Sequence, residues 1–126
     1  MKHELTPGLL LNEQGDLNEA GFSLCPVKTY ERKQIKGMKW RIKEWDYYYI
    51  GNSKYGLCLT ISDVSFLALC SVTFLDFENK KQPAKTVIKP FTFGKVGLPS
   101  SSSSGNVEFE NRKFSLSFKH ENGKDI

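Results

Sequence analysis

Residues 55–77 decide the fold class, and they read YGLCLTISDVSFLALCSVTFLDF. In residues 55–61 every second side chain is large and apolar, which is the period of a strand with one buried face. Residues 66–77 are largely apolar on both faces, as is typical of a central strand. Ser62-Asp63 between them is a turn sequence. This stretch therefore predicts two neighbouring antiparallel strands at the centre of a sheet.

The register of these two strands follows from the pairing that keeps apolar side chains together. With residues 63–64 as a two-residue tip, Ile61 faces Phe66 and the apolar side chains gather on one face. A one-residue slip would place Cys58 opposite Cys70 and would mix apolar with polar side chains. We therefore expect the first register, and we expect the three cysteines of the chain to be free thiols.

Further strand patterns extend the sheet on both sides. Residues 40–50 predict a strand before the central pair, and residues 85–93 predict an extended segment after it. Residues 107–110 and 114–118 predict a final hairpin, preceded by a flexible surface loop over residues 94–105. Regularly spaced strands of this kind predict an all-β, antiparallel sandwich or barrel.

The composition predicts a folded, soluble protein. The chain has 126 residues, of which 39% are hydrophobic and 25% charged, so it has enough apolar surface for one core. No apolar run is long enough to cross a bilayer and no signal peptide is evident, so we expect a soluble protein without membrane insertion. The odd number of cysteines and the absence of any Asn-x-Ser/Thr sequon favour the reducing cytoplasm. The cysteines form no CxxC pair and the two histidines, His3 and His120, lie near opposite ends. We therefore expect no metal and no other cofactor.

The positive charge of the chain is concentrated in one stretch. The net charge is +4, and between Lys28 and Lys43 seven cations are opposed only by Glu31. Tyrosines and tryptophans follow, so this stretch fits a phosphate track beside a stacking platform for single-stranded nucleic acid. The interpretation we favour is a solvated loop that leads into a strand, because a phosphate site needs convergent cations.

Candidate ligand-binding residues lie in the strand predicted over residues 40–50. Alternation places Trp40, Glu44, Asp46 and Tyr48 on one face and Trp45 on the other. If the first face lines a pocket, its carboxylates would orient a ligand within an aromatic surround. The structural alternative, which we favour, is that the carboxylates pair with lysine, arginine or tyrosine side chains. No catalytic residue is predicted, because no motif of high specificity occurs.

Several segments together resemble a known family. They occur in order along the chain: Thr6-Pro7, Leu10-Leu11-Asn12 with Gly15, Gly21-Phe22, Lys43-Glu44-Trp45-Asp46-Tyr47-Tyr48, Leu59-Thr60-Ile61-Ser62-Asp63, Ser71-Val72 and Gly97-Leu98-Pro99. They resemble the uncharacterised bacterial family called domain of unknown function 2804, and the block over residues 43–48 is the most specific part. The resemblance implies that residues 1–126 form a single β domain, the N-terminal portion of a longer family architecture. It also implies a lipocalin-like β-barrel or half-barrel of calycin type, similar to the carotenoid-hydratase-like group.

Three classes of function follow. The first is a lipocalin-like module that binds a small apolar or amphipathic ligand. The second is half of a hydratase- or isomerase-type enzyme completed by a second domain, and the third is the single-stranded nucleic-acid module. We also expect a homodimer, because an apolar stripe on residues 114–118 lies beside an open strand edge. The alternative to a dimer is that residues 9–12 fold back and close the sheet.

Overall fold

The structure is a computed structural model, and it describes residues 2–101, 104–112, 114–121 and 124–125. Two short strands and two 3₁₀ turns come first: β1 (Gly8–Leu9), β2 (Lys28–Thr29), η1 (Arg32–Gln34) and η2 (Lys39–Arg41). The main strands follow: β3 (Glu44–Gly51), β4 (Tyr55–Asp63), β5 (Leu67–Asp76), β6 (Ala84–Pro90), β7 (Val107–Asn111) and β8 (Phe114–Phe118). Two short strands, β9 (His120–Glu121) and β10 (Lys124–Asp125), come last.

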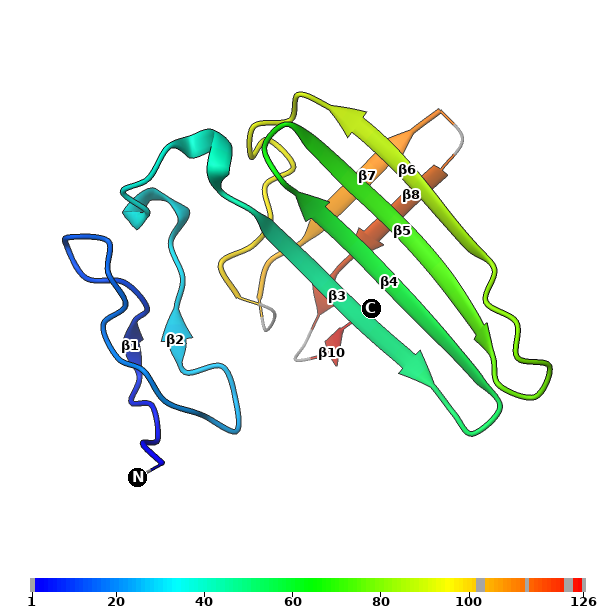
Figure 1. The fold of residues 1–126 in the computed structure, drawn as a ribbon, viewed down its shortest axis with the longest axis horizontal. Coiled ribbons are helices and arrows are strands. Elements are labelled where there is room, and N and C mark those ends of the chain that lie inside the picture. The colour runs from blue at the N-terminus through cyan, green and yellow to red at the C-terminus, as the bar shows by residue number, and fades with distance from the viewer. Residues whose placement is uncertain (1, 102–103, 113, 122–123, 126) are drawn as a thin grey trace.

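The centre of the fold is a four-stranded antiparallel sheet in the order β3-β4-β5-β6 (Figure 1). As the sequence predicts, β4 and β5 are its central pair, and β3 and β6 form its edges. The antiparallel hairpin β7–β8 lies against one face, which we call the inner face. The fold is therefore all-β and antiparallel, apart from the short parallel pair β1–β2. Within the described ranges, the strands do not close into a barrel.

The predicted register of β4 and β5 is wrong. Ile61 pairs with Cys70 rather than with Phe66, and Asp63 pairs with Ala68. The reason is the turn, which is longer than a two-residue tip: the Asp63 carboxyl accepts a 2.8 Å hydrogen bond from the backbone N–H of Ser65, a residue with φ 70°. The observed partner of Ile61 lies an even number of residues further along the chain than the predicted partner. Because side chains alternate between faces with a period of two, the side chains of β4 and β5 keep the faces predicted for them.

The cysteines lie apart, as expected. Cys58 pairs with Thr73 on the outer face of the sheet, whereas Cys70 is buried on the inner face. Cys25 is exposed, and all three are free thiols in the structure. Burial raises the pKa of the Cys70 thiol to about 11, so Cys70 behaves as a small apolar core residue.

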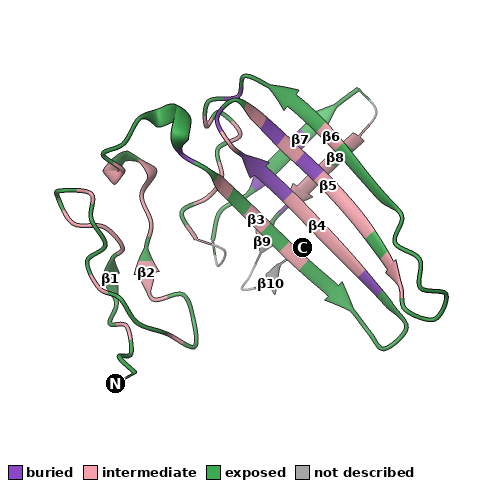
Figure 2. Cartoon of the chain, viewed as in Figure 1, coloured by how far each residue is buried: buried purple, intermediate pink, exposed green. Residues whose placement is uncertain are grey.

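The hydrophobic core lies between the inner face and the hairpin. Its buried apolar residues come from both layers: Ile61, Ala68, Cys70, Val107, Phe109 and Phe118 (Figure 2). The apolar stripe of β8 is therefore covered within the chain, because Phe118 is buried and Phe114 and Leu116 pack against the core. The homodimer stays a prediction, which sedimentation equilibrium can compare with the monomer mass of 14.4 kDa.

Two predicted segments differ from the structure. Residues 40–50 are not one strand, because β3 begins at Glu44 and residues 39–41 form the 3₁₀ turn η2. Residues 9–12 do not close the sheet, because Gly8–Leu9 pairs with Lys28–Thr29 in a separate two-stranded ladder. In the part of the chain that the structure describes, no helix is long and apolar enough to cross a membrane.

Candidate functional site

A small cavity lies between the inner face and the hairpin. Its volume is about 90 Å³. Its walls come from β3, β4, β7, β8, the loop before β7 and the two residues after β8. The lining residues are Asp46, Tyr48, Ile50, Leu59, Pro99, Ser101, Gly105, Val107, Ser117, Phe118, Lys119 and His120. The alternation of β3 turns Asp46, Tyr48 and Ile50 into the same space. The rings of Tyr48 and Phe118 meet across it with centroids 4.6 Å apart.

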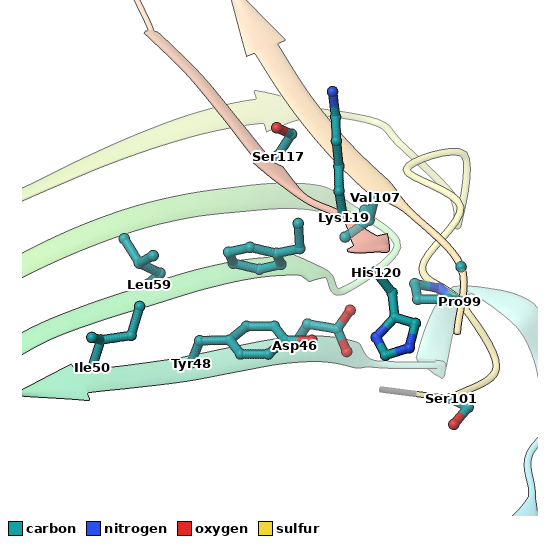
Figure 3. Close-up of a pocket in the computed structure, with 12 residues that line it drawn as sticks. Asp46, Tyr48, Ile50, Leu59, Pro99, Ser101, Val107, Ser117, Lys119 and His120 are labelled. Carbon is teal, nitrogen blue, oxygen red and sulfur yellow. The ribbon is translucent and has the colours of Figure 1, made fainter. Parts of the chain in front are cut away.

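The cavity is polar at one end and apolar at the other. Figure 3 shows Asp46 and His120 together at one end, and Ile50 and Leu59 at the other. The backbone N–H of His120 donates a 3.1 Å hydrogen bond to Oδ1 of Asn106, which fixes the chain just after β8. The site therefore combines a carboxyl group, an imidazole and apolar walls in one space.

Asp46 is a carboxyl group that lines the cavity and has a shifted pKa. Burial raises the pKa of Asp46, and the nearby charge of Glu44 raises it further. The side chain is half-buried on the inner face of β3. Asp46 therefore holds its proton to a higher pH than an exposed aspartate would, and in that protonated form it can donate as well as accept a hydrogen bond.

The raised pKa of Asp46 predicts a pH-dependent stability difference. The folded state binds the Asp46 proton more tightly, so the resulting stabilisation is present below the ordinary aspartate pKa and is lost as the pH rises through the raised pKa. We expect Asp46→Asn, which cannot ionise, to gain stability relative to the unmodified chain between about pH 3 and about pH 7. Urea unfolding at both pH values measures this gain. Asp16→Asn, in an exposed turn, controls for the substitution, and an equal gain there would contradict the assignment.

Glu44 has a different role from Asp46. Its carboxylate accepts a 2.5 Å hydrogen bond from the Tyr30 hydroxyl and forms an ion pair with Arg32. Burial and this hydrogen bond raise the pKa of Tyr30. Glu44 thus joins the segment before η1 to the first residue of β3. This arrangement agrees with the structural interpretation of that carboxylate.

Removal of the Glu44 carboxylate is expected to destabilise the fold. Glu44→Ala leaves the Tyr30 hydroxyl and the Arg32 guanidinium without their acceptor, so we expect a loss of about 1–3 kcal/mol in the free energy of unfolding. Urea melts measure this loss. Glu13→Ala, at an exposed turn position, is the matched control. An unchanged midpoint in Glu44→Ala would show that the contact does not hold the two segments together.

The five predicted ligand-binding residues lie in three places. Asp46 and Tyr48 line the cavity. Glu44 and Trp45 line a shallower cleft beside it, together with Asp46. Trp40 lies in η2, where its ring contacts Phe66 at a centroid distance of 5.6 Å, so it does not share the cavity.

His120 could not be identified as a cavity residue from the sequence. It follows β8 in the chain, and only the packing of the hairpin on the inner face brings it next to β3 (Figure 3). The alternation of residues 114–118 predicts the hairpin but contains no information about the strand that the hairpin covers. The alternation of their strands identifies Leu59 and Phe118 as core residues. It does not show that a cavity lies between them.

Several cations of the basic stretch have acidic partners. Lys28 forms an ion pair with Glu19, and its contact lowers the pKa of that carboxyl to about 2. Arg32 pairs with Glu44, as described above. Lys33 pairs with Glu31 at 2.8 Å. These pairs reduce the positive charge that this stretch offers to a phosphate backbone.

The fold and the site define an all-β antiparallel domain with an apolar-walled cavity at its layer interface. Residues 2–126 match the family described as Domain of unknown function (DUF2804), so the chain belongs to this family. No curated protein and no solved structure matches the chain.

Proposed function

We propose that this protein is a lipocalin-like module, a half-barrel of calycin type, that binds a small amphipathic ligand in the inner-face cavity. The apolar part of the ligand would lie against Tyr48, Leu59 and Phe118, and its polar head would lie at Asp46 and His120. The observation that carries the proposal is the division of one cavity into an apolar wall and an end with two titratable side chains. Ligand pockets in proteins typically have this combination.

The size of the cavity limits what it can hold. At about 90 Å³ it is smaller than the roughly 150 Å³ cavity that accommodates benzene, and smaller than the roughly 300–1,000 Å³ of most ligand pockets. Only part of an amphipathic molecule fits inside. The remainder needs apolar surface directly next to the cavity.

The inner face provides such surface. Ile50, Leu57 and Phe74 form a row across β3, β4 and β5, next to the row of Tyr48 and Leu59. Ile50 is 64% exposed and Phe74 is 40% exposed. This row is therefore continuous with the cavity, through Ile50, and it is open to solvent. A hydrocarbon chain that leaves the cavity would cover it.

A series of linear alcohols from hexanol to dodecanol tests the proposal. Each buried CH₂ contributes about 0.8 kcal/mol, so we expect the affinity to rise by up to about fourfold per carbon. Ile50→Ser should reduce this dependence on chain length. Ile88→Ser is the matched control, because Ile88 is 59% exposed on the outer face of β6. Equal loss in both variants, or no binding of any alcohol, would contradict the proposal.

A second candidate function is half of a hydratase- or isomerase-type enzyme completed by a second domain. The observation that favours it is Asp46, whose raised pKa keeps a proton available within an apolar cavity beside an imidazole. Such a carboxyl suits general acid catalysis on a lipid-like substrate. In this case Asp46→Asn would still bind the alcohol series, because asparagine keeps a hydrogen-bonding side chain, but it would abolish turnover in a family member that contains both domains.

A further inference from the structure

Three segments far apart in the sequence meet at one end of the sheet. They are η2, the turn between β4 and β5, and the segment that follows β6 (Figure 1). The Ser65 hydroxyl donates a 2.9 Å hydrogen bond to the carbonyl oxygen of Lys39. The backbone N–H of Phe91 bonds to the Phe66 carbonyl at 2.6 Å, and that of Phe93 bonds to the Ser65 carbonyl at 2.7 Å. These contacts hold the three segments as one unit.

This unit turns large apolar side chains to solvent. The exposed fractions are 59% for Met38, 47% for Trp40, 52% for Phe66, 70% for Phe91 and 52% for Phe93. Trp40 contacts Phe66, and the rings of Phe91 and Phe93 stack with centroids 6.3 Å apart. We call these five residues the aromatic tip. Met38 directly precedes η2, and the four rings form two contacting pairs rather than scattered exposed residues.

The backbone is strained where two of these rings are exposed. Phe91 has φ 57° and Phe93 has φ 49°, in the left-handed region that residues other than glycine rarely adopt. Thr92 between them is 5% exposed, and its hydroxyl donates a 2.9 Å hydrogen bond to the buried Asp63. The anchored threonine thus holds both phenylalanines outward. Strain that keeps apolar rings in water suggests a role for those rings at a surface.

The charges around the aromatic tip are mainly positive. Lys39, Arg41 and Lys95 are exposed in these segments. Residues 38–41, 64–66 and 91–97 contain no aspartate or glutamate. Glu108 and Glu110 of β7 line one pocket with Lys89, Phe91 and Lys95, so cations still outnumber carboxylates around the tip. The complementary surface is therefore anionic as well as able to receive apolar rings.

We propose that the aromatic tip docks on an anionic lipid bilayer. Its rings would enter the boundary between headgroups and acyl chains, and its cations would face the headgroups, with no part of the chain crossing the membrane. Single-stranded nucleic acid fits less well, because such sites place stacking rings along a charged groove. Here the rings belong to a 3₁₀ turn and two loops, and they contact one another in pairs. The proposal does not depend on the ligand cavity.

Vesicle sedimentation tests the proposal with the full 126-residue chain. We expect binding to vesicles that contain phosphatidylglycerol, and weak binding to pure phosphatidylcholine. Because each cation near an anionic surface contributes about fivefold in affinity, Lys39→Gln with Arg41→Gln should weaken binding about 25-fold at low salt. The control pair Lys80→Gln with Lys81→Gln lies at the opposite end of the sheet, beyond β5, and should change binding little.

The apolar contribution is tested with a second pair of variants. Phe91→Ser with Phe93→Ser should reduce binding about tenfold or more, whereas Phe77→Ser should not. Phe77 is 45% exposed and follows β5, away from the aromatic tip. Urea melts show whether each variant remains folded. If the serine variants unfold, the glutamine variants, which change only exposed charges, still decide the question.

The fluorescence of the two tryptophans shows which part of the protein contacts the vesicle. Trp45→Phe leaves Trp40 in the aromatic tip as the reporter, and Trp40→Phe leaves Trp45 on the outer face. We expect vesicles to shift the fluorescence of Trp40 to the blue further than that of Trp45. An equal or larger shift of Trp45 would overturn the proposal. Loss of vesicle binding together with tight, salt-dependent binding of an oligonucleotide would also overturn it and would favour nucleic acid.

Discussion

Asp63→Ala is expected to lower the free energy of unfolding by about 3–5 kcal/mol. Asp63 is 1% exposed, and its carboxyl accepts hydrogen bonds from the Ser65 N–H at 2.8 Å and the Thr92 hydroxyl at 2.9 Å. A longer contact of 3.4 Å joins it to the Val96 N–H. Alanine would leave these donors without their acceptor inside the fold. Urea or thermal unfolding measures the loss.

Two other variants define the cause of this loss. Asp63→Asn keeps one acceptor oxygen, so it should recover part of the lost stability. Asp16→Ala, at an exposed turn position, should change stability by less than about 0.5 kcal/mol. A loss below about 1 kcal/mol in Asp63→Ala would contradict the role of Asp63 as the anchor of the turn and of the segment after β6.

Phe109→Ala should have an effect of similar size, through packing. Phe109 is 3% exposed in β7 and belongs to the core shared by the hairpin and the sheet. Truncation of a buried phenylalanine to alanine costs about 3–5 kcal/mol, because it removes apolar burial and leaves a cavity. Phe77→Ala, at a 45% exposed phenylalanine, is the matched control. Similar losses in both variants would show that the hairpin does not form the core with the inner face.

The sequence predicts the strands better than their connections. The alternation in residues 55–61 and 114–118 identifies β4 and β8, because a half-buried strand shows its period locally. The register of β4 and β5 could not be predicted, since it depends on the hydrogen bond from Ser65 to Asp63 within the turn. The sequence pattern starts β3 too early for a similar reason. The 3₁₀ turn η2 is held by the hydrogen bond from the Ser65 hydroxyl to the carbonyl oxygen of Lys39, which no local pattern shows.

The candidate site could be predicted only in part. The alternation of side chains along β3 places Asp46 and Tyr48 on one face, and both line the cavity. His120 and Phe118 reach it through the packing of two layers, which local patterns do not encode. Trp40 was assigned to the same face on the assumption of a continuous strand, and the 3₁₀ turn at residues 39–41 moves it to the aromatic tip.

Residues of the loop before β7 also differ from a purely local prediction. Val96 and Leu98 pack against the core, although the serine-rich sequence around them predicts a mobile surface loop. The hydrogen bond from the Val96 N–H to Asp63 joins this loop to the β4–β5 turn. The loop thus contributes to the wall of the cavity through Pro99 and Ser101.

The central claim is that the inner-face cavity binds an amphipathic molecule with its polar head at Asp46 and His120. Nuclear Overhauser contacts between decanol and the protein test this claim most directly. We predict contacts from the alkyl protons to Tyr48, Leu59 and Phe118, and from the carbon that carries the hydroxyl to His120. Contacts confined to the outer face, at Trp45 or Ile88, or no contacts in saturated decanol, would contradict it.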